Sequence, residues 1–406
     1  MKLLRATRLA LVAWCFIDVA AAAAQTMPRE PDASSLRVRI GPLGLRPSIG
    51  LTNAGVDTNV FYEPDALKPE RDVTLTVTAQ SDYWLRMGRT WATGQLKEDL
   101  IWYQKFTDER SANQNYTLYW LVPLNRLTVS VGGNWLDAKE RPGFEIDART
   151  RRRELAGGGV VELRAFSKTF IGGRGQRRKV EFDQGEEFRG RDLQNELNRT
   201  RTEGGLKVRH ELTPLTSIGF EVAKAEDRFE FSTARDSDST QATGSVTFAP
   251  AALISGSAQF GYRRFTPRDP LVPGYRGSTA NVSLSHVARG STKLNLSILR
   301  DVQYSFDLAQ PYYVQTGFDA MAGQQIYGPV DVEARFGRHG LAYRDRGGSG
   351  NPSRTDHIRT VGGGVGYRLG RDLRVGFNVD RQERESDVLS LDYSGVRYGL
   401  AVTYGL

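Results

Sequence analysis

Apolar and polar residues alternate along many short stretches of this chain. In residues 371–380 the apolar positions are Leu373, Val375, Phe377 and Val379, and each is separated from the next by a polar residue or glycine. The same period of two recurs at 73–80, 127–134, 280–286 and 330–338. Strict alternation predicts β-strands with one apolar and one polar face, because successive side chains of a strand point to opposite sides.

About 18 such segments can be laid out, and 16 to 18 are compatible with the pattern. The predicted strands cover 45–54, 72–87, 91–106, 112–123, 127–139, 148–164, 168–180, 193–210, 216–230, 238–248, 252–266, 277–287, 292–304, 311–321, 326–343, 355–369, 372–385 and 390–405. No stretch has the pattern of a long amphipathic helix. The fold class is therefore all-β, in a single domain.

The connections between these strands alternate in length. Short turns are predicted at 88–90, 124–126, 165–167, 211–215, 249–251, 288–291, 322–325 and 370–371, and longer connections at 55–71, 140–147, 181–192, 267–276 and 344–354. Short turns at one end and long loops at the other, along an even number of strands, are typical of a transmembrane antiparallel β-barrel with periplasmic turns and extracellular loops. A soluble sandwich is the alternative, but its strands are fewer and shorter.

The start of the chain has the features of an export signal. Lys2, Arg5 and Arg8 precede a short apolar run, and Ala20 to Ala24 offer small residues for cleavage. We expect a signal peptide at 1–24, a periplasmic segment at 25–44 and the barrel at 45–406. Cleavage would remove Cys15, the only cysteine, so the mature chain would have no disulfide. It would also change the formal net charge from +8 to +6.

The last predicted strand carries a candidate recognition signal for the barrel-assembly machinery. Gly399, Val402 and Tyr404 follow the spacing of the C-terminal signal of outer-membrane barrels, although the chain ends in Gly405-Leu406 rather than in an aromatic residue. Aromatic residues on the apolar parity of strands, such as Tyr116 and Trp120, suit the girdles at membrane interfaces. Ordinary packing on a sheet would also explain them.

The polar parity should line a water-filled lumen. The candidate lumen residues are Arg164, Arg174, Arg178, Arg209, Arg263, Arg335, Arg374, Asp331 and Glu333. Both signs of charge are present, and arginine is the most frequent. An interior of this kind favours passage of hydrophilic solute, unless inward-folded loops plug it.

A basic cluster is predicted at the extracellular rim. Its candidate members are Arg149, Arg151, Arg152, Arg153, Arg177 and Lys179. Inward-facing members would attract anionic solute, and outward-facing members would meet the phosphates of lipopolysaccharide. The alternative is a solvated rim balanced by the acidic stretch Glu181 to Asp192.

The sequence gives no support for an enzyme, a cofactor or a metal site. The four histidines, His210, His286, His339 and His357, lie on separate segments, and no nucleophile or metal motif accompanies them. The glycine runs at 157–159 and 362–364 lie inside predicted strands, where they suit bends of a barrel wall better than phosphate loops. The expected export of the chain also argues against binding to nucleic acid.

The chain resembles the putative β-barrel porin 2 family of Gram-negative bacteria. The resemblance rests on the segment Gly55 to Phe61 and on the segment Arg300 to Asp307, which is followed by Tyr312 and Tyr313. It implies an outer-membrane location and a role as a pore for surface polysaccharide, and the arginines of the lumen and rim would suit export of an anionic exopolysaccharide. The partners would be outer-membrane lipid and lipopolysaccharide, the barrel-assembly machinery, polysaccharide and periplasmic export components. The alternative is a loop-plugged structural barrel that binds lipopolysaccharide or a periplasmic partner.

Overall fold

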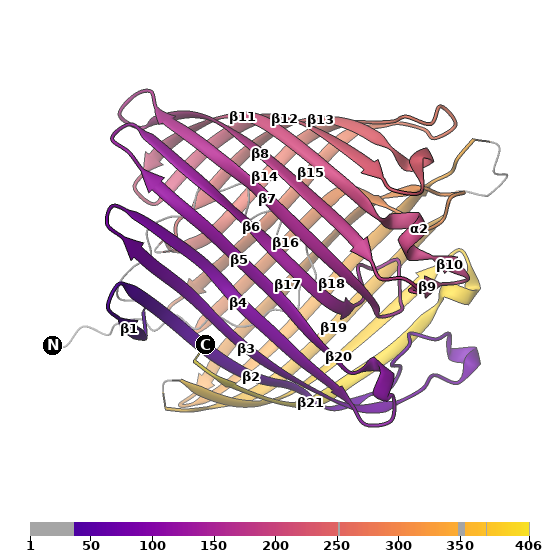
Figure 1. Ribbon diagram of the computed structural model, residues 1–406. Coiled ribbons are helices and arrows are strands. Elements are labelled where there is room, and N and C mark those ends of the chain that lie inside the picture. Colours follow the sequence, from indigo (N-terminus) through magenta and orange to yellow (C-terminus); the bar gives the residue numbers. More distant parts are fainter. Residues whose placement is uncertain (1–35, 251, 348–353, 371, 406) are drawn as a thin grey trace.

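The chain forms a closed barrel of 18 antiparallel strands (Figure 1). The computed structural model describes residues 36–250, 252–347, 354–370 and 372–405. The signal peptide expected at 1–24, and the part of the expected periplasmic segment up to residue 35, lie outside these described residues. The all-β prediction and the strand number are thus confirmed.

The barrel strands are long enough to cross a bilayer at a tilt, which takes about 9–11 residues. They are β2 (Leu43–Asp57), β3 (Asp72–Met87), β4 (Thr90–Tyr103), β5 (Ser111–Pro123), β6 (Leu127–Glu140), β7 (Thr150–Arg164), β8 (Thr169–Phe182), β11 (Arg199–Thr213), β12 (Thr216–Phe229), β13 (Ser237–Phe248), β14 (Ile254–Pro267), β15 (Tyr275–Ala288), β16 (Thr292–Tyr304), β17 (Tyr312–Tyr327), β18 (Val330–Arg344), β19 (Thr355–Leu369), β20 (Leu373–Ser386) and β21 (Tyr393–Tyr404).

Smaller elements sit at the two ends of the barrel. They are β1 (Val38–Ile40), which pairs with the start of β2, the β9–β10 hairpin (Glu187–Phe188 and Arg191–Asp192), the helix α2 (Leu193–Leu197), and four 3₁₀ turns, η2 (Asp65–Leu67), η3 (Thr107–Glu109), η4 (Thr233–Arg235) and η5 (Leu389–Leu391).

Each barrel strand pairs with its neighbours in the chain, and β2 closes the ring by pairing with β21. Ile49 lies opposite Tyr404 at one end of this closing pair, and Asp57 lies opposite Arg397 at the other. A closed ring leaves no unpaired edge, which is a requirement for strands in hydrocarbon, where no water can satisfy free backbone groups.

Both described ends of the chain lie at the end of the barrel that carries the short turns, and α2, β9 and β10 lie at the opposite end (Figure 1). In an outer-membrane barrel the short turns face the periplasm and the longer loops face outward. We therefore call the end that bears α2 the extracellular end.

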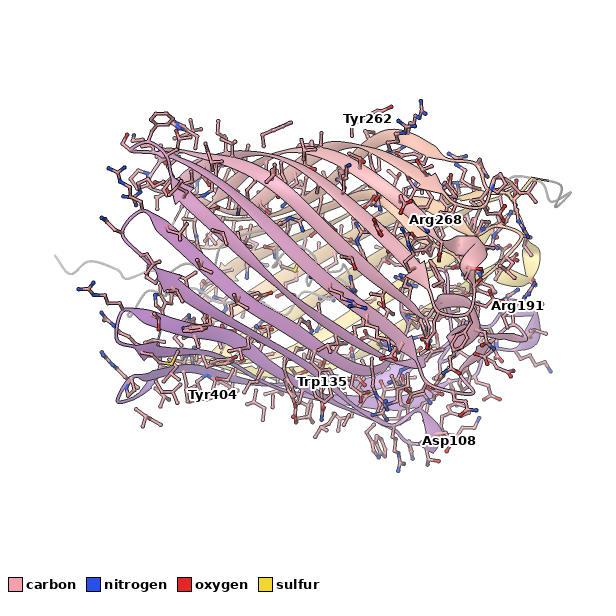
Figure 2. All side chains as sticks on the ribbon, turned by 45° about the horizontal axis from the view of Figure 1, so that its top comes forward. Asp108, Trp135, Arg191, Tyr262, Arg268 and Tyr404 are labelled. Atoms are coloured by element: carbon pink, nitrogen blue, oxygen red, sulfur yellow. The ribbon has the colours of Figure 1, made fainter. Side chains whose placement is uncertain are left out.

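The outer wall is apolar because every second side chain of each strand points away from the lumen. Leu206 is 76% exposed and Phe260 is 59% exposed. Figure 2 shows the aromatic residues Trp135, Tyr262 and Tyr404 on this outer surface. In water such a surface would be unfavourable, so the wall is suited to lipid.

Two predicted boundaries are wrong. Residues 193–197, expected to begin a strand, form α2, because Asp192 accepts hydrogen bonds from the backbone N–H of Gln194 and Asn195 and so caps a helix. The turn expected at 322–325 lies instead at 328–329. There Gly328 adopts a φ of 50°, a conformation that glycine reaches without a steric penalty.

Candidate pore lumen and its constriction

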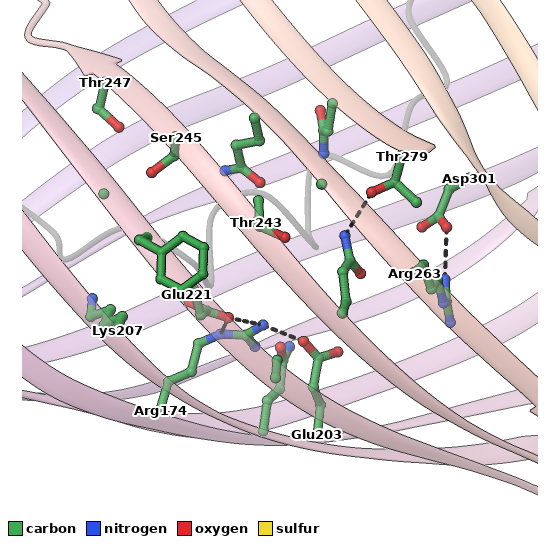
Figure 3. A pocket seen from close by; sticks show the side chains of 18 of the residues that line it. Arg174, Glu203, Lys207, Glu221, Thr243, Ser245, Thr247, Arg263, Thr279 and Asp301 are labelled. Atoms are coloured by element: carbon green, nitrogen blue, oxygen red, sulfur yellow. Dashed lines mark hydrogen bonds and ion pairs between the residues drawn. The ribbon is translucent and has the colours of Figure 1, made fainter. Parts of the chain in front are cut away.

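A cavity of 470 Å³ lies inside the barrel along β7, β8 and β11–β16. Its lining contains many charged groups on the β7–β8–β11 side and many hydroxyl and amide groups on the β12–β15 side. Figure 3 shows both kinds of side chain from close by. Polar lumen residues on every second position follow from the same alternation that makes the outer wall apolar.

Arg174 on β8 forms the centre of the charged side. Its Nε donates to Glu221 Oε1 at 2.8 Å, and its Nη2 also pairs with Glu203 (Figure 3). The Arg174 side chain is only 4% exposed. A buried guanidinium between two carboxylates is held in place by both, and its charge is largely compensated.

Further ion pairs continue this ladder toward the periplasmic end. Glu162 on β7 accepts from Lys207 Nζ at 2.7 Å and from Arg209 Nη2 at 2.9 Å. One carboxylate therefore orients two cations. Toward the extracellular end, Arg178 pairs with Glu154, which also accepts from Arg152 Nε at 2.8 Å. The charged side of the lumen is thus a continuous series of paired groups.

The adjoining side of the cavity, on β12–β15, carries many uncharged donors and acceptors and one ion pair. Gln241 Nε2 donates to Thr279 Oγ1 at 3.0 Å, and Arg263 Nη1 pairs with Asp301 at 2.7 Å (Figure 3). The hydroxyl and amide residues that line the cavity are Gln176, Ser217, Gln241, Thr243, Ser245, Thr247, Gln259, Thr279, Asn281 and Gln303. Such groups can exchange hydrogen bonds with solute hydroxyls.

A second charged group lies on β18 and β20. Arg374 contacts Asp331 at 2.6 Å and Glu333 at 3.2 Å, and Arg335 Nε donates to Asp380 at 2.9 Å. Asp331, Glu333 and Arg374 are buried. Beside them the wall is built from glycine, and a Cβ at Gly366 would lie 2.4 Å from Arg374 Nη2. The glycines of β19 thus make room for the arginine side chains of neighbouring strands.

The structure brings five of the nine candidate lumen residues to the first cavity and the other four to the second group. The five are Arg164, Arg174, Arg178, Arg209 and Arg263, and the four are Asp331, Glu333, Arg335 and Arg374. Arg164 lies at the periplasmic end, with its guanidinium 5.4 Å from the centroid of the Phe170 ring.

The six candidate rim residues divide between several environments. Arg149, expected at the start of a strand, lies in the connection before β7, where its Nη2 donates to the Lys139 carbonyl at 2.8 Å and its side chain is 6% exposed. Arg152 points inward to Glu140 at 3.1 Å and to Glu154.

The outward-facing rim residues are mostly paired with carboxylates. Arg151 and Arg153 both contact Asp137 and Asp183, and Lys179 contacts Glu181 at 2.6 Å. Arg177 is exposed on the same face. Asp183 and Glu181 belong to the acidic stretch, so the contacts follow the pattern of a balanced, solvated rim more closely than that of an anion-binding cluster.

The connection between β6 and β7 folds into the barrel. We call residues 141–149 the constriction segment. Glu145 and Ile146 are buried to 2% and 4% exposure. Glu145 Oε1 accepts from Ser305 Oγ at 2.5 Å, and Ser305 follows β16. Because β8 and β11–β15 lie between β7 and β16 in the ring, the segment reaches across the barrel to the far wall.

Two buried arginines hold this segment. Arg384 on β20 donates to the Glu145 carbonyl at 3.2 Å and to Asp147 at 2.8 Å, and it also pairs with Asp356. Arg235 of η4 pairs with Glu196 of α2 and donates to the Ser305 carbonyl at 3.1 Å. These contacts join connections from several parts of the ring at the extracellular end.

Apolar packing supports the same arrangement. Ile146 belongs to a buried cluster with Phe188, Leu193, Phe229 and Phe306, to which Val180, Phe182 and Leu197 also contribute. On the other side of the segment, the Phe144 ring lies 4.3 Å from that of His339. A segment with its own apolar core is a folded constriction rather than a loop lying over the surface.

Burial of this segment changes the acidity of its carboxyl groups. Burial raises the pKa of Glu145 to about 7, against the opposing effect of the Ser305 hydrogen bond and of the Arg354 and Arg384 charges. Burial also raises the pKa of Asp147 to about 6, although the Arg384 charge lowers it. Both carboxyl groups thus titrate near physiological pH.

Sequence reasoning missed the residues of the constriction. Glu145, Asp147 and Arg235 were assigned to connections, where a strand pattern gives no information on burial. One available signal was composition. The stretch from Gly143 to Ile146 places two apolar residues, Phe144 and Ile146, in a connection that would otherwise be polar.

The histidines do not form a catalytic group. His339 is 1% exposed, and its Nε2 lies 3.1 Å from Asp319, while His210 Nδ1 lies 3.0 Å from Thr169 Oγ1 on the facing strand. No cluster of three metal-binding side chains occurs among the described residues. No helix among the residues that the structure describes is long and apolar enough to cross a membrane.

The candidate assembly signal lies on the closing strand. Tyr404 is 53% exposed on the outer face at the periplasmic end, and Val402 shares its parity (Figure 2). Gly399 points to the lumen side, where Gly55 of β2 lies directly opposite. Recognition of these residues by an assembly machine stays a prediction.

Comparison with known proteins gives the family. The family model described as putative beta-barrel porin 2 matches residues 34–405. No curated protein matches the chain. Among solved structures, Acinetobacter baumannii OccAB4 is similar with a TM-score of 0.47 and 11% identity over 89% of this chain and 97% of that chain. A BenF-like porin from Pseudomonas fluorescens Pf-5 has a TM-score of 0.48 and 9% identity, over 89% of this chain and 98% of that one.

A third structure, OprD of Pseudomonas aeruginosa, has a TM-score of 0.45 and 10% identity, with 92% of this chain and 97% of that chain covered. The family match spans the whole closed barrel, including both strands of the closing pair. A polar lumen, an apolar outer wall and a closed 18-stranded ring agree with a channel rather than an enzyme. The chain belongs to the putative beta-barrel porin 2 family and is a porin-like β-barrel of the Gram-negative outer membrane.

Proposed function

We propose that this barrel conducts hydrophilic, hydroxyl-rich solute, with an acidic exopolysaccharide as the substrate class. The main support for this proposal is the composition of the lumen wall. An arginine-rich, ion-paired part of the wall on β7, β8 and β11 adjoins a part on β12–β15 that is rich in hydroxyl and amide groups, and both line one cavity. Sugar hydroxyls can exchange hydrogen bonds with the second side, and sugar carboxylates can compete for the arginines of the first.

The pairing of the arginines supports transport rather than tight retention. Arg174 is satisfied by Glu203 and Glu221 when no solute is present. An acidic solute that contacts Arg174 replaces an existing carboxylate, so the net gain is small. Weak contacts at several successive sites are what conduction needs, because a solute must leave each site as well as enter it.

The constriction segment supports a second candidate, a barrel whose passage is closed until its loop is displaced. The segment crosses the lumen near the extracellular end and is held by Arg384 and Ser305. A structural barrel plugged by this loop would have the same contacts. The two functions differ in conductance once the segment is removed.

Single-channel recording in a planar bilayer distinguishes them. The proteins are the wild-type barrel and a variant in which residues 142–148 are replaced by a short Gly-Ser linker. We expect small or intermittent conductance for the wild type and a steady, larger conductance for the variant. Absence of current in both proteins, with folding shown by heat-modifiable migration, would contradict a conducting role and favour the structural barrel.

The substrate class is tested with oligogalacturonate and neutral dextran of similar length, added to the linker variant. We expect more frequent current blockades with the acidic oligomer. The Arg174→Gln and Arg178→Gln substitutions together should reduce this preference. As a matched control, Arg381→Gln changes an arginine that is 60% exposed on the strand β20. Equal blockade by both oligomers would contradict the acidic class and leave the pore itself intact.

A further inference from the structure

The outer wall carries an arc of arginines that point away from the lumen. We call Arg264, Arg276, Arg300, Arg338 and Arg359 the outer basic arc. Arg264 on β14 lies directly opposite Arg276 on β15, and Arg338 on β18 lies directly opposite Arg359 on β19. Arg300 on β16 lies opposite Thr316 on β17, and its Nη1 donates to Thr316 Oγ1 at 2.6 Å. The arc therefore spans the adjacent strands β14–β19.

These side chains share the parity of the lipid-facing residues. Arg264 comes two residues after Tyr262, which is 57% exposed on the outer surface. Arg338 comes two residues after Phe336, which is 38% exposed. In both strands the chain runs from the periplasmic turn to the extracellular end, so the arginines lie just beyond the apolar and aromatic band. This is the level of the lipid headgroups in the outer leaflet.

The arc differs from the basic rim in its charge compensation. Within the described residues, no carboxylate oxygen lies within 4 Å of any of the five guanidinium groups, whereas Arg151, Arg153 and Lys179 each have such a contact. Two acidic residues on strands that adjoin the arc pair with other arginines. Asp238 pairs with Arg228 and Arg268, and Glu383, which lies opposite Arg359, pairs with Arg381.

Like charges directly opposite each other on one face of a sheet are destabilising. Two such pairs on one stretch of wall are explained if anions lie between them. Guanidinium groups bind phosphate in bidentate fashion, which makes arginine the preferred residue for this task. At the headgroup level of the outer leaflet, the abundant phosphate is that of lipopolysaccharide.

The apolar surface next to the arc suits the acyl chains of the same molecule. The Phe318 and Phe336 rings pack against each other in a tilted arrangement, with centroids 5.6 Å apart, and the Arg359 guanidinium lies 5.9 Å from the Phe336 ring centroid. Phe318 lies directly opposite Arg338. A lipid whose phosphate is held by Arg338 and Arg359 would have its acyl chains over this aromatic pair.

We propose that the outer basic arc binds the phosphate groups of lipid A, the membrane anchor of lipopolysaccharide, and so ties one side of the barrel to the outer leaflet. This role is independent of conduction through the lumen. It assigns the lipid contact to β14–β19, and not to the basic rim on β7 and β8, where Asp137 and Asp183 neutralise the arginines.

The test compares three proteins with the wild type in vesicles. The arc variants are Arg264→Gln/Arg276→Gln and Arg338→Gln/Arg359→Gln, and the matched control is Arg151→Gln/Arg153→Gln. Each is refolded in phosphatidylcholine vesicles with or without bisphosphorylated lipid A. Lipid A from which both phosphates have been removed is the second probe. The readouts are the Tm of the barrel and the apparent affinity for lipid A.

The difference in stability between the arc variants and the wild type should depend on whether the vesicles contain lipid A. In phosphatidylcholine alone, the arc variants should be at least as stable as the wild type, because opposed like charges are removed. With bisphosphorylated lipid A, the Tm of the wild type and of the control should rise, and that of the arc variants should rise less. The affinity of each arc variant should fall by roughly tenfold or more, since charged hydrogen bonds are lost.

Two results would overturn the proposal. One is equal stabilisation of the arc variants and the wild type by bisphosphorylated lipid A. The other is equal stabilisation of the wild type by lipid A with and without phosphates. Inorganic phosphate in phosphatidylcholine vesicles serves as a further arm. If it alone reproduces the full effect at the same phosphate concentration, the arc is a general anion site and the assignment to lipid is wrong.

Discussion

Glu145 and Arg384 are 239 positions apart in the sequence, yet Arg384 Nη1 donates a hydrogen bond to the Glu145 carbonyl at 3.2 Å. The same nitrogen lies 2.8 Å from Asp147, and the Arg384 side chain is fully buried. One arginine on the wall thus holds the backbone and a side chain of a segment that starts on another part of the ring.

Replacing Arg384 with methionine should release the constriction segment. The change removes the arginine that donates to the Asp147 carboxylate, while Asp356 keeps its pair with Arg354, and breaking a buried pair costs about 3–5 kcal/mol. We expect larger conductance and faster cleavage after Glu145 by a glutamate-specific protease, with the barrel still folded. Arg381→Gln on the same strand is the control and should leave both readouts unchanged. Unaltered conductance in the methionine variant would show that Arg384 does not hold the constriction.

Docking of the constriction segment should weaken as pH rises. The pKa of Glu145 is raised by burial from 4.5 to about 7, so the docked state favours the protonated form. Its contribution to docking is fully present below about pH 4.5 and is lost as pH rises toward 7. Asp147 acts in the same direction, with a pKa raised from 3.8 to about 6. We therefore expect conductance to increase between pH 4.5 and pH 8.

The Glu145→Gln variant tests the origin of this pH dependence. Glutamine is neutral throughout, so the upper part of the conductance increase, near pH 7, should disappear. Glu187→Gln, at an exposed position on β9, is the control and should keep the wild-type profile. An identical pH profile in Glu145→Gln would assign the effect to other groups.

Neutralising Glu162 should increase anion preference in the lumen. Its carboxylate orients both Lys207 and Arg209. The Glu162→Gln variant leaves these two cations without their shared counter-charge, so they should attract anions more strongly. Reversal potential in a salt gradient measures the change, with the linker variant as background. Glu98→Gln changes an exposed glutamate that contacts Tyr116 on the outer wall and should leave the reversal potential unchanged.

A charge on the outer wall should destabilise the barrel, whereas the same charge in the lumen should not. Leu206 lies in the middle of β11 and is 76% exposed to the lipid side. Leu206→Arg should cost about 2–4 kcal/mol, the cost of arginine at the bilayer midplane. Gln259 lines the lumen cavity, and Gln259→Arg should have a much smaller effect. Urea unfolding in vesicles gives both values, and equal destabilisation would contradict the assignment of faces.

Substitution at the end of β21 tests the candidate assembly signal. Tyr404→Ala should reduce the amount of folded barrel in the outer membrane of cells, while refolding of the purified protein into vesicles should change little. Tyr398→Ala, on the same outer face of the strand, is the comparison. A parallel loss in cells and in vesicles would indicate a packing role for Tyr404 and no recognition by an assembly machine.

The sequence by itself determined the wall of this protein. Alternation such as that of Leu373, Val375 and Phe377 predicts a strand with one apolar and one polar face, because the side-chain period of a strand is two. Strand number, the short periplasmic turns and the polar lumen follow from this period. Two boundary errors arose where local chemistry interrupts this period, at the cap of α2 by Asp192 and at the turn around Gly328.

Only the tertiary structure decided which charges compensate each other. Lys207 and Arg209 share Glu162, and Arg384 reaches Asp147, because ring closure and strand register bring distant positions together. The same register places Arg338 opposite Arg359, while Glu383, on the other side of Arg359, pairs with Arg381. Sequence periodicity assigns a residue to a face of the wall, but the energy of a charge depends on its neighbours across the strands, and these are fixed only when the ring closes.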